Sequence, residues 1–95
     1  MPRPKKCRRI GGAPAHRCFK PNGVPMSKLN KINILPEELE ALRLADYHNM
    51  SQQAAADQMG VSRQTFGNIV NQARYKVAAS LIEGSALLFE EENIE

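Results

Sequence analysis

Apolar residues recur at three- and four-residue steps through the second half of the chain, the period of amphipathic helices. Over residues 34–48, ILPEELEALRLADYH, the apolar stripe consists of Leu35, Leu39, Leu42 and Ala45, widened by Ala41 and Leu44. Pro36 suits a first helical turn, and the glutamates after it lie where the helix dipole favours negative charge. We therefore expect a helix here, with Glu38, Arg43 and Asp46 on its solvated face.

Two further helices are predicted, each preceded by a serine that can cap it and followed by a glycine. Ser51 precedes the short segment QQAAADQM, which Gly60 closes. Ser62 precedes a longer helix that we expect to end at Glu83, before Gly84. Its apolar stripe consists of Phe66, Ile69, Val70, Ala73, Val77 and Leu81. Beyond it, the segment SALLFE is expected to be a short strand or an extended tail, able to pair with part of the N-terminal region.

The N-terminal region has a different character. Residues 1–36 hold all six prolines and nine bases but no acid, whereas residues 37–95 hold four bases and all ten acids. Because proline fixes φ and lacks an amide proton, the first stretch cannot be a long helix. We expect an irregular, extended basic arm (1–33) that could include a short strand, a helical domain (34–84), and an extended segment with an acidic tail (85–95). Such an arm favours contact with a polyanion over a merely solubilising tail.

Composition narrows the class of protein. Ninety-five residues suffice for one small domain, and 42% hydrophobic with 24% charged residues is ordinary for a folded chain. No apolar run approaches the roughly 20 residues of a membrane helix. Two cysteines without an export signal indicate a reducing cytoplasm. The sequence contains no P-loop, dinucleotide-binding turn or nucleophile elbow, so we expect neither an enzyme nor a cofactor.

The segment QAAADQMGVSRQTFGNIV has the layout of a DNA-binding helix-turn-helix. Ala56 is small where two helices would touch, and Gly60 permits the positive φ of a tight turn. Val61 would fill the corner, while Phe66 and Ile69 would point into the core. A helical hairpin without a ligand uses the same residue types, so the spacing alone does not decide between the two.

Two features favour DNA over a plain hairpin. The outward face of the second helix is polar and nearly free of acids, and arginine and amide side chains can read guanine and adenine in the major groove. Gly67 lies inside that helix at a cost of about 1 kcal/mol relative to alanine, which is explained if the backbone there approaches DNA closely. The predicted base-reading residues are Ser62, Arg63, Gln64, Gly67, Asn68 and Asn71, with Arg63, Gln64 and Asn68 making most contacts.

A second set of residues is expected to contact the DNA backbone. It comprises Gln52, Gln53, Thr65, Arg74 and Lys76 of the helical domain and Arg3, Lys5, Lys6, Arg8 and Arg9 of the arm. Arg74 and Lys76 have a simpler alternative role, which is to balance acids. One small module buries little DNA surface, so we expect a homodimer on double-stranded DNA. The long helix and SALLFE are the candidate dimer surfaces.

The helical domain resembles region four of bacterial sigma factors, which contacts the −35 promoter element. Over nearly all of its length the chain resembles a family of small, uncharacterised prokaryotic proteins predicted to bind DNA. The motifs that carry this resemblance are MPRPKKCRRI, FKPNGVP, LEALRLAD, GVSRQTF and KVAASLIEGSALLFE. The resemblance implies a three- or four-helix, sigma-like or winged helix-turn-helix domain and a DNA-binding role. Together with the helical pattern, it leads us to predict a mainly α protein that acts in transcription regulation.

Two other functions remain open. A sigma-like module could bind RNA polymerase or a regulator and need no DNA, with the acidic tail serving that contact or shielding the basic arm. A metal- or redox-responsive regulator could use Cys7, His16 and Cys18, whose basic neighbours would make the thiols more reactive. These three residues fall short of the four ligands of a structural zinc site. Two free thiols are therefore the simpler interpretation, and we expect no metal.

Overall fold

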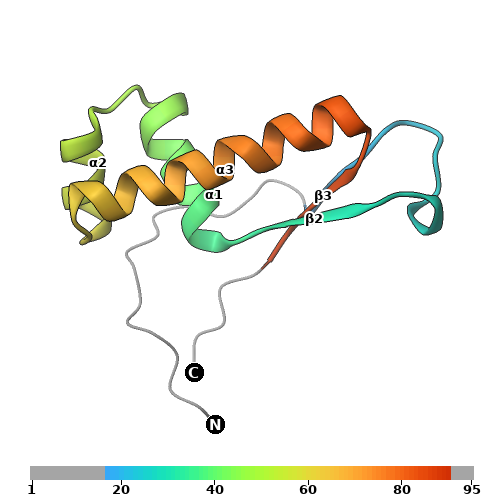
Figure 1. The fold of residues 1–95 in the computed structure, drawn as a ribbon, viewed down its shortest axis with the longest axis horizontal. Coiled ribbons are helices and arrows are strands. Elements are labelled where there is room, and N and C mark those ends of the chain that lie inside the picture. The colour runs from blue at the N-terminus through green and yellow to red at the C-terminus, as the bar shows by residue number, and fades with distance from the viewer. Residues whose placement is uncertain (1–16, 91–95) are drawn as a thin grey trace, which may run out of the picture.

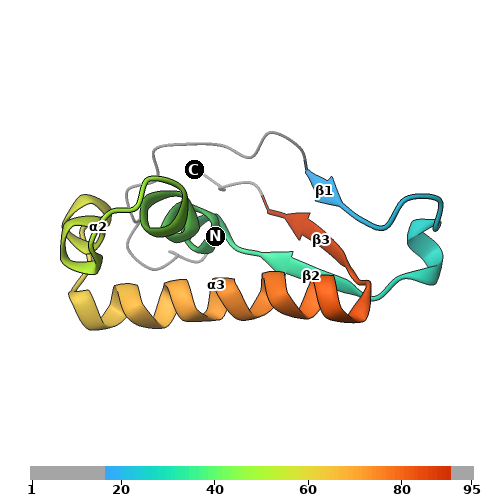
Figure 2. The same cartoon turned by 90° about the horizontal axis from the view of Figure 1, so that it is seen from above.

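The computed structural model describes residues 17–90, in which three helices pack with a small three-stranded sheet (Figures 1 and 2). The mainly helical class expected from the sequence is confirmed. The elements in chain order are β1 (Cys18–Phe19), a 3₁₀ turn (Met26–Lys28), β2 (Lys31–Ile34), α1 (Pro36–Leu42), a π-helical segment (Arg43–Tyr47), α2 (Gln52–Met59), α3 (Arg63–Glu83) and β3 (Ala86–Phe89). No helix of the described residues is long and apolar enough to cross a membrane.

The last strand of the chain is the middle strand of the sheet. β3 pairs antiparallel with β1 and parallel with β2, where Lys31 lies opposite Ala86 and Ile34 opposite Phe89. The segment after Gly84 is therefore a strand that pairs with part of the N-terminal region, as the sequence suggested. The Phe89 amide also donates to the Arg17 carbonyl at 2.9 Å. Both ends of the described chain consequently lie side by side.

Residues 17–33 are more regular than an irregular arm, and they contain short strands of the kind that the sequence allowed. They contain β1, the 3₁₀ turn and most of β2, and the division placed between residues 33 and 34 falls inside β2. The prolines are compatible with this sheet, because Pro21 and Pro25 lie in the connection between the strands, where no ladder hydrogen bond is required. Burial of Ile34 then attaches β2 to the body of the protein.

The helix ends follow the predicted capping residues. The Ser51 hydroxyl accepts from the Ala54 amide at 3.1 Å, and the Ser62 hydroxyl accepts from the Thr65 amide at 3.0 Å. Gly60 after α2 has φ of 75°, a left-handed conformation that costs glycine little. The serine before each helix and the glycine after it therefore set where α2 and α3 begin and end.

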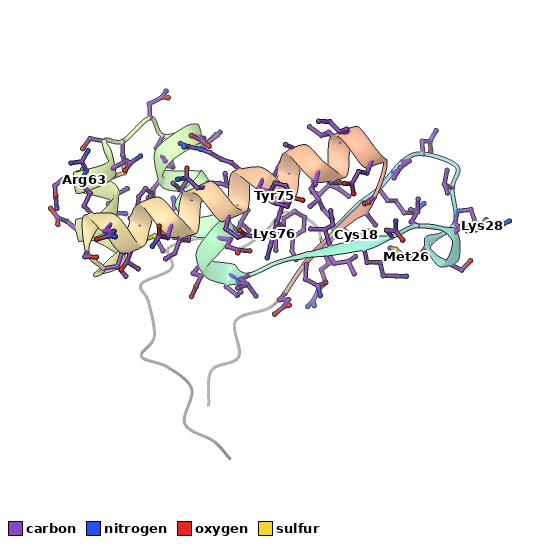
Figure 3. The ribbon with its side chains drawn as sticks, in the orientation of Figure 1. Cys18, Met26, Lys28, Arg63, Tyr75 and Lys76 are labelled. Atoms are coloured by element: carbon purple, nitrogen blue, oxygen red, sulfur yellow. The ribbon has the colours of Figure 1, made fainter. Side chains whose placement is uncertain are left out.

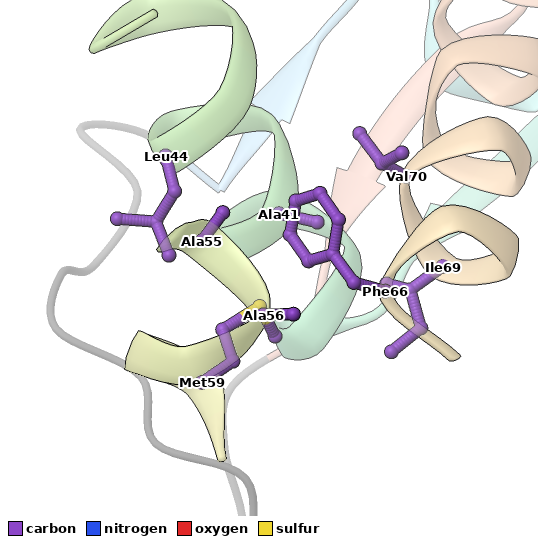
Figure 4. Close-up of a cluster of buried hydrophobic side chains, with 8 residues drawn as sticks. All are labelled: Ala41, Leu44, Ala55, Ala56, Met59, Phe66, Ile69 and Val70. Carbon is purple, nitrogen blue, oxygen red and sulfur yellow. The ribbon is translucent and has the colours of Figure 1, made fainter. Parts of the chain in front are cut away.

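The core lies where α1, α2 and the first half of α3 meet. In Figure 4 the Phe66 ring points from α3 toward α1, with small side chains of α2 beside it. Val61 packs against the core from the turn between α2 and α3. The buried cluster consists of Ala41, Leu44, Ala55, Ala56, Met59, Phe66, Ile69 and Val70. Two of the three consecutive alanines are fully buried, which allows α2 to approach its neighbours closely.

Glu38 is buried, and the expectation that it lies on a solvated face is wrong. Its Oε1 accepts from Lys76 Nζ of α3 at 2.7 Å and from the Leu35 amide at 2.9 Å. Lys76 Nζ also donates to the Asn33 carbonyl of β2 at 2.8 Å. A buried carboxylate is tolerable only with such partners, and the sequence does not reveal a partner 38 residues away. These bonds join α1, α3 and β2.

Leu81 is exposed, although its spacing placed it in the apolar stripe of α3. The inward position on that turn is taken by Ser80, whose hydroxyl donates to the Ser85 carbonyl at 2.6 Å. Since neighbouring helical residues point about 100° apart, Leu81 turns outward and is 78% exposed. The apolar stripe therefore ends one turn earlier than predicted.

Two ion pairs of α3 should differ sharply in their contribution to stability. The side chains of Lys76 and Glu38 are 18% and 6% exposed, whereas those of Arg74 and Asp46 are 44% and 45% exposed. Lys76→Met should lower the free energy of unfolding by about 3 kcal/mol, because it leaves the buried Glu38 carboxylate without its cation. The matched Arg74→Met should cost less than about 1 kcal/mol. Urea denaturation compares them, and equal losses would contradict the asymmetry.

Candidate nucleic-acid interface

The start of α3 presents a row of exposed polar side chains. They lie at the end of α3 that is remote from the sheet, where Figure 3 labels Arg63. The exposed residues of the predicted base-reading set are Ser62, Arg63, Gln64, Asn68 and Asn71, while Gly67 is half-buried. The predicted face therefore exists as one continuous surface. It is held from behind by Phe66 and Ile69, which are buried on the opposite side of the same turns.

Four of these side chains are available for a ligand. Within residues 17–90, no hydrogen bond or ion pair engages the side chains of Arg63, Gln64, Asn68 and Asn71. Ser62 differs, because its hydroxyl caps α3 and also donates to the Thr65 hydroxyl at 2.9 Å. The structure therefore gives Ser62 and Thr65 a helix-capping role, and the prediction that they contact DNA is untested.

The N-terminus of α2 lies beside the first turns of α3. A Cβ added at Gly67 would lie 3.6 Å from Gln52 Oε1, an ordinary contact distance. Gln52 is half-buried at this point, whereas Gln53 is exposed and donates to the Asp57 carboxylate at 2.9 Å. The predicted phosphate-contacting glutamines are thus next to the predicted base-reading face, on the adjoining helix.

Arg74 and Lys76 are engaged within the fold. Arg74 donates to both carboxylate oxygens of Asp46, at 2.8 and 3.1 Å, and these hydrogen bonds hold the pKa of Asp46 below its ordinary value. Lys76 pairs with Glu38 as described above. Arg74 and Lys76 therefore each neutralise an acid within the fold, the role that the sequence offered as an alternative to a DNA contact. The pairing of Asp46 with Arg74 could not be predicted from the sequence, because the two residues are 28 positions apart and periodicity does not identify partners on different helices.

Charge is distributed unevenly around this face. Residues 35–90 carry four bases and seven acids. Three of the four bases, Arg43, Arg74 and Lys76, each form an ion pair with an acid of α1 or of the π-helical segment. Arg63 is the only base of that stretch without an ion pair among the described residues. Arg3, Lys5, Lys6, Arg8 and Arg9 lie outside the described residues.

A metal site receives no support from the described part of the chain. Cys18 is a free, half-buried thiol on β1, and Cys7 and His16 lie outside the described residues. Between residues 17 and 90, no three His, Cys, Asp or Glu side chains are grouped to hold a metal ion. The arrangement C-x8-H-x-C accordingly stays a sequence-based hypothesis.

The free space at Gly67 leads to a prediction about folding. Gly67 does not have a positive φ and its Cβ would meet only the end of a flexible side chain. Gly67→Ala should therefore raise the free energy of unfolding by about 1 kcal/mol, the helix-interior difference between the two residues. Gly60→Ala is the matched control and should lower stability by about 1–2 kcal/mol, because its φ is 75°. Urea midpoints of both variants test this, and a destabilised Gly67→Ala would contradict it.

The chain belongs to the family described as "Protein of unknown function DUF134", whose model matches residues 1–95. A UPF0251 protein of Vibrio parahaemolyticus is 67% identical over 96 residues, covering 99% of this chain and all of that protein. UPF0251 proteins of Aeromonas salmonicida and Shewanella sediminis are 54% and 50% identical, covering 95% and 100% of this chain and 88% and 99% of theirs. No solved structure matches the chain.

Proposed function

We propose that this DUF134 protein is a sequence-specific double-stranded DNA-binding protein that acts in transcription regulation. The α2–turn–α3 unit serves as a helix-turn-helix, and the start of α3 enters the major groove. The single observation that carries the proposal is the exposed row of Arg63, Gln64, Asn68 and Asn71, which has no partner among residues 17–90. Four unengaged hydrogen-bonding side chains on one rigid helix face match what base recognition requires.

The chemistry of this face suits base edges. The Arg63 guanidinium can donate two parallel hydrogen bonds to guanine O6 and N7, and the carboxamides of Gln64 and Asn68 can each bracket adenine N6 and N7. From Arg63 to Ile82 the helix contains no acid, so no like charge on α3 repels the phosphates on either side of the groove. The Gly67 backbone supplies the closest approach, since it lacks a side chain between α3 and its ligand.

The electrostatic attraction to DNA phosphates must come mostly from outside the helical domain, in the N-terminal region of the chain. Residues 35–90 have a formal charge of −3, whereas residues 1–34 carry nine bases and no acid. Counterion release by such bases supplies affinity without sequence information. The helical body therefore selects the sequence, and the N-terminal region holds the protein on the duplex.

Selection from a random duplex library tests base reading directly. We expect the native protein to enrich a defined motif at physiological salt, and Arg63→Ala to lose about 1–3 kcal/mol of discrimination at one base position. Arg63→Lys keeps the positive charge but lacks the planar guanidinium that donates two parallel hydrogen bonds. This variant should therefore retain overall affinity and still lose selectivity at that base position.

Two further variants sharpen this test. Gln58→Ala, on an exposed position of α2 outside the row, should leave the motif unchanged. Gly67→Ala should bind the selected duplex more weakly despite its gain in folding stability. Identical motifs for the native protein and Arg63→Ala would refute base reading by Arg63, and the absence of any motif would refute sequence-specific binding.

The basic arm predicts a steep dependence of binding on salt. Deleting residues 2–9 removes Arg3, Lys5, Lys6, Arg8 and Arg9. Each phosphate contact contributes a slope of about 0.9 in log K against log salt, so deleting five bases should flatten the slope by up to about 4.5. The selected motif should persist, because the base-reading row is untouched. Titration of a labelled duplex at several salt concentrations measures the slope, and an unaltered slope would exclude the arm from the DNA contact.

A second candidate function is supported by the negative charge of the helical body. A region-four-like module with seven acids in residues 35–90 could instead contact a basic surface of RNA polymerase or of a regulator. The library selection separates the two functions. Weak, motif-free binding to every duplex together with retention of RNA polymerase subunits would favour the protein contact.

A further inference from the structure

The C-terminal end of α3, remote from the proposed base-reading row, has large apolar side chains exposed to solvent. Leu81 and Ile82 are 78% and 85% exposed, and the 52% exposed ring of Phe19 lies on β1 nearby. Between the helix end and β1 lies a hollow of about 310 Å³, lined in part by Phe19, Pro21, Leu81 and Leu87. We call this the end surface. The connection between β1 and β2 extends past it, beyond the C-terminus of α3 (Figures 1 and 2).

The end surface has both a projection and a recess. Exposed leucine and isoleucine side chains project from α3 immediately beside a hollow large enough to receive an aliphatic side chain. A two-fold contact brings the same patch of both partners together, so each patch must complement itself. A projection adjoining a recess meets this requirement, because each copy can insert its own side chain into the hollow of the other.

The charges of the end surface are also complementary to themselves. Lys20 lines the hollow, and Glu83 is exposed at the last position of α3, next to Ile82. Lys20 donates only to the nearby Val24 carbonyl within the described residues, and Glu83 has no partner there. One base and one acid at the edge of the patch allow two Lys20–Glu83 pairs across a two-fold axis, with no like charges opposed.

We infer that the end surface binds a second copy of this chain. Leu81 of each protomer enters the hollow of its partner, and Lys20 faces the partner's Glu83. The interface unites an apolar centre with a charged rim, the usual organisation of protein interfaces. The described C-terminus is a less suitable occupant, because the Glu90 amide donates to the carbonyl of Ile34, the last residue of β2, at the far end of β3.

This dimer also fits the proposed function, on which the following consequence rests. At 100° per residue, Leu81 points roughly 70° away from the centre of the base-reading row, so the partner sits beside α3 and leaves the row open. Fourteen residues separate Gly67 from Leu81, which is about 21 Å of helix. With the dimer contact at Leu81, the base-reading rows of two protomers can therefore lie up to about 42 Å apart. If the two α3 helices are inclined to each other, this separation falls to about 34 Å, the distance between DNA half-sites one helical turn apart.

Self-association of the full-length protein without DNA is the direct test. Sedimentation across a concentration series should show a dimer for the native chain. Leu81→Ser should weaken dimerisation at least about tenfold, because both halves of the interface lose an inserted apolar side chain. Leu81 is already exposed, so the variant should fold normally. Tyr47→Ser, an equally exposed residue on the π-helical segment, is the matched control and should dimerise like the native protein.

Charge-reversal variants distinguish a specific interface from non-specific hydrophobic association. Lys20→Glu and Glu83→Lys should each weaken the dimer, and combining them should restore it. A monomeric native chain, or a dimer indifferent to Leu81→Ser and to the charge reversals, would overturn the inference.

The failures of the two proposals are distinguishable. A monomer that still enriches a duplex motif would leave the DNA-binding function standing without this dimer. A dimer that depends on Leu81 but enriches no motif would leave the dimer standing without the function.

Discussion

The buried ion pair between Glu38 and Lys76 connects the helices to the sheet. Its glutamate closes the first turn of α1, and its lysine reaches from the middle of α3 to the Asn33 carbonyl of β2. In the parallel pairing of β2 with β3, alternate carbonyls point away from the partner strand, so this contact satisfies an outward-facing group of an edge strand. The pair therefore sets the position of the sheet relative to α3 and protects the edge of the sheet.

The long helix α3 contacts both the helical core and the sheet. Its first half packs by Phe66, Ile69 and Val70 on α1 and α2, and its second half lies along the sheet. One rigid element consequently carries the polar row and contributes Leu81 and Ile82 to the end surface. The separation between the row and Leu81 is fixed by helix geometry, so the surface proposed for DNA recognition and the surface proposed for self-association keep a constant spacing.

The sequence predicts local features of this fold better than distant ones. Capping by Ser51 and Ser62, the turn at Gly60 and the burial of Phe66 and Ile69 follow from residue chemistry and spacing within a few positions. The burial of Glu38 and the pairing of Asp46 with Arg74 depend on partners 38 and 28 residues away, which periodicity cannot identify. Leu81 was misassigned because a three- or four-residue repeat leaves open which of two adjacent residues points inward. The exposed positions of Arg63, Gln64, Asn68 and Asn71 follow from a local pattern, whereas the end surface needs β1 and α3 together.

The pairing of β1 with β3 has an electrostatic consequence. The hydrogen bond from Phe89 to Arg17 anchors both ends of the described chain at one point. From that point the chain continues in one direction into residues 1–16, with five bases and no acid, and in the other into residues 91–95, with three acids and no base. The fold therefore joins a segment with a formal charge of +5 and a segment with a formal charge of −3 to neighbouring strands of the sheet, β1 and β3.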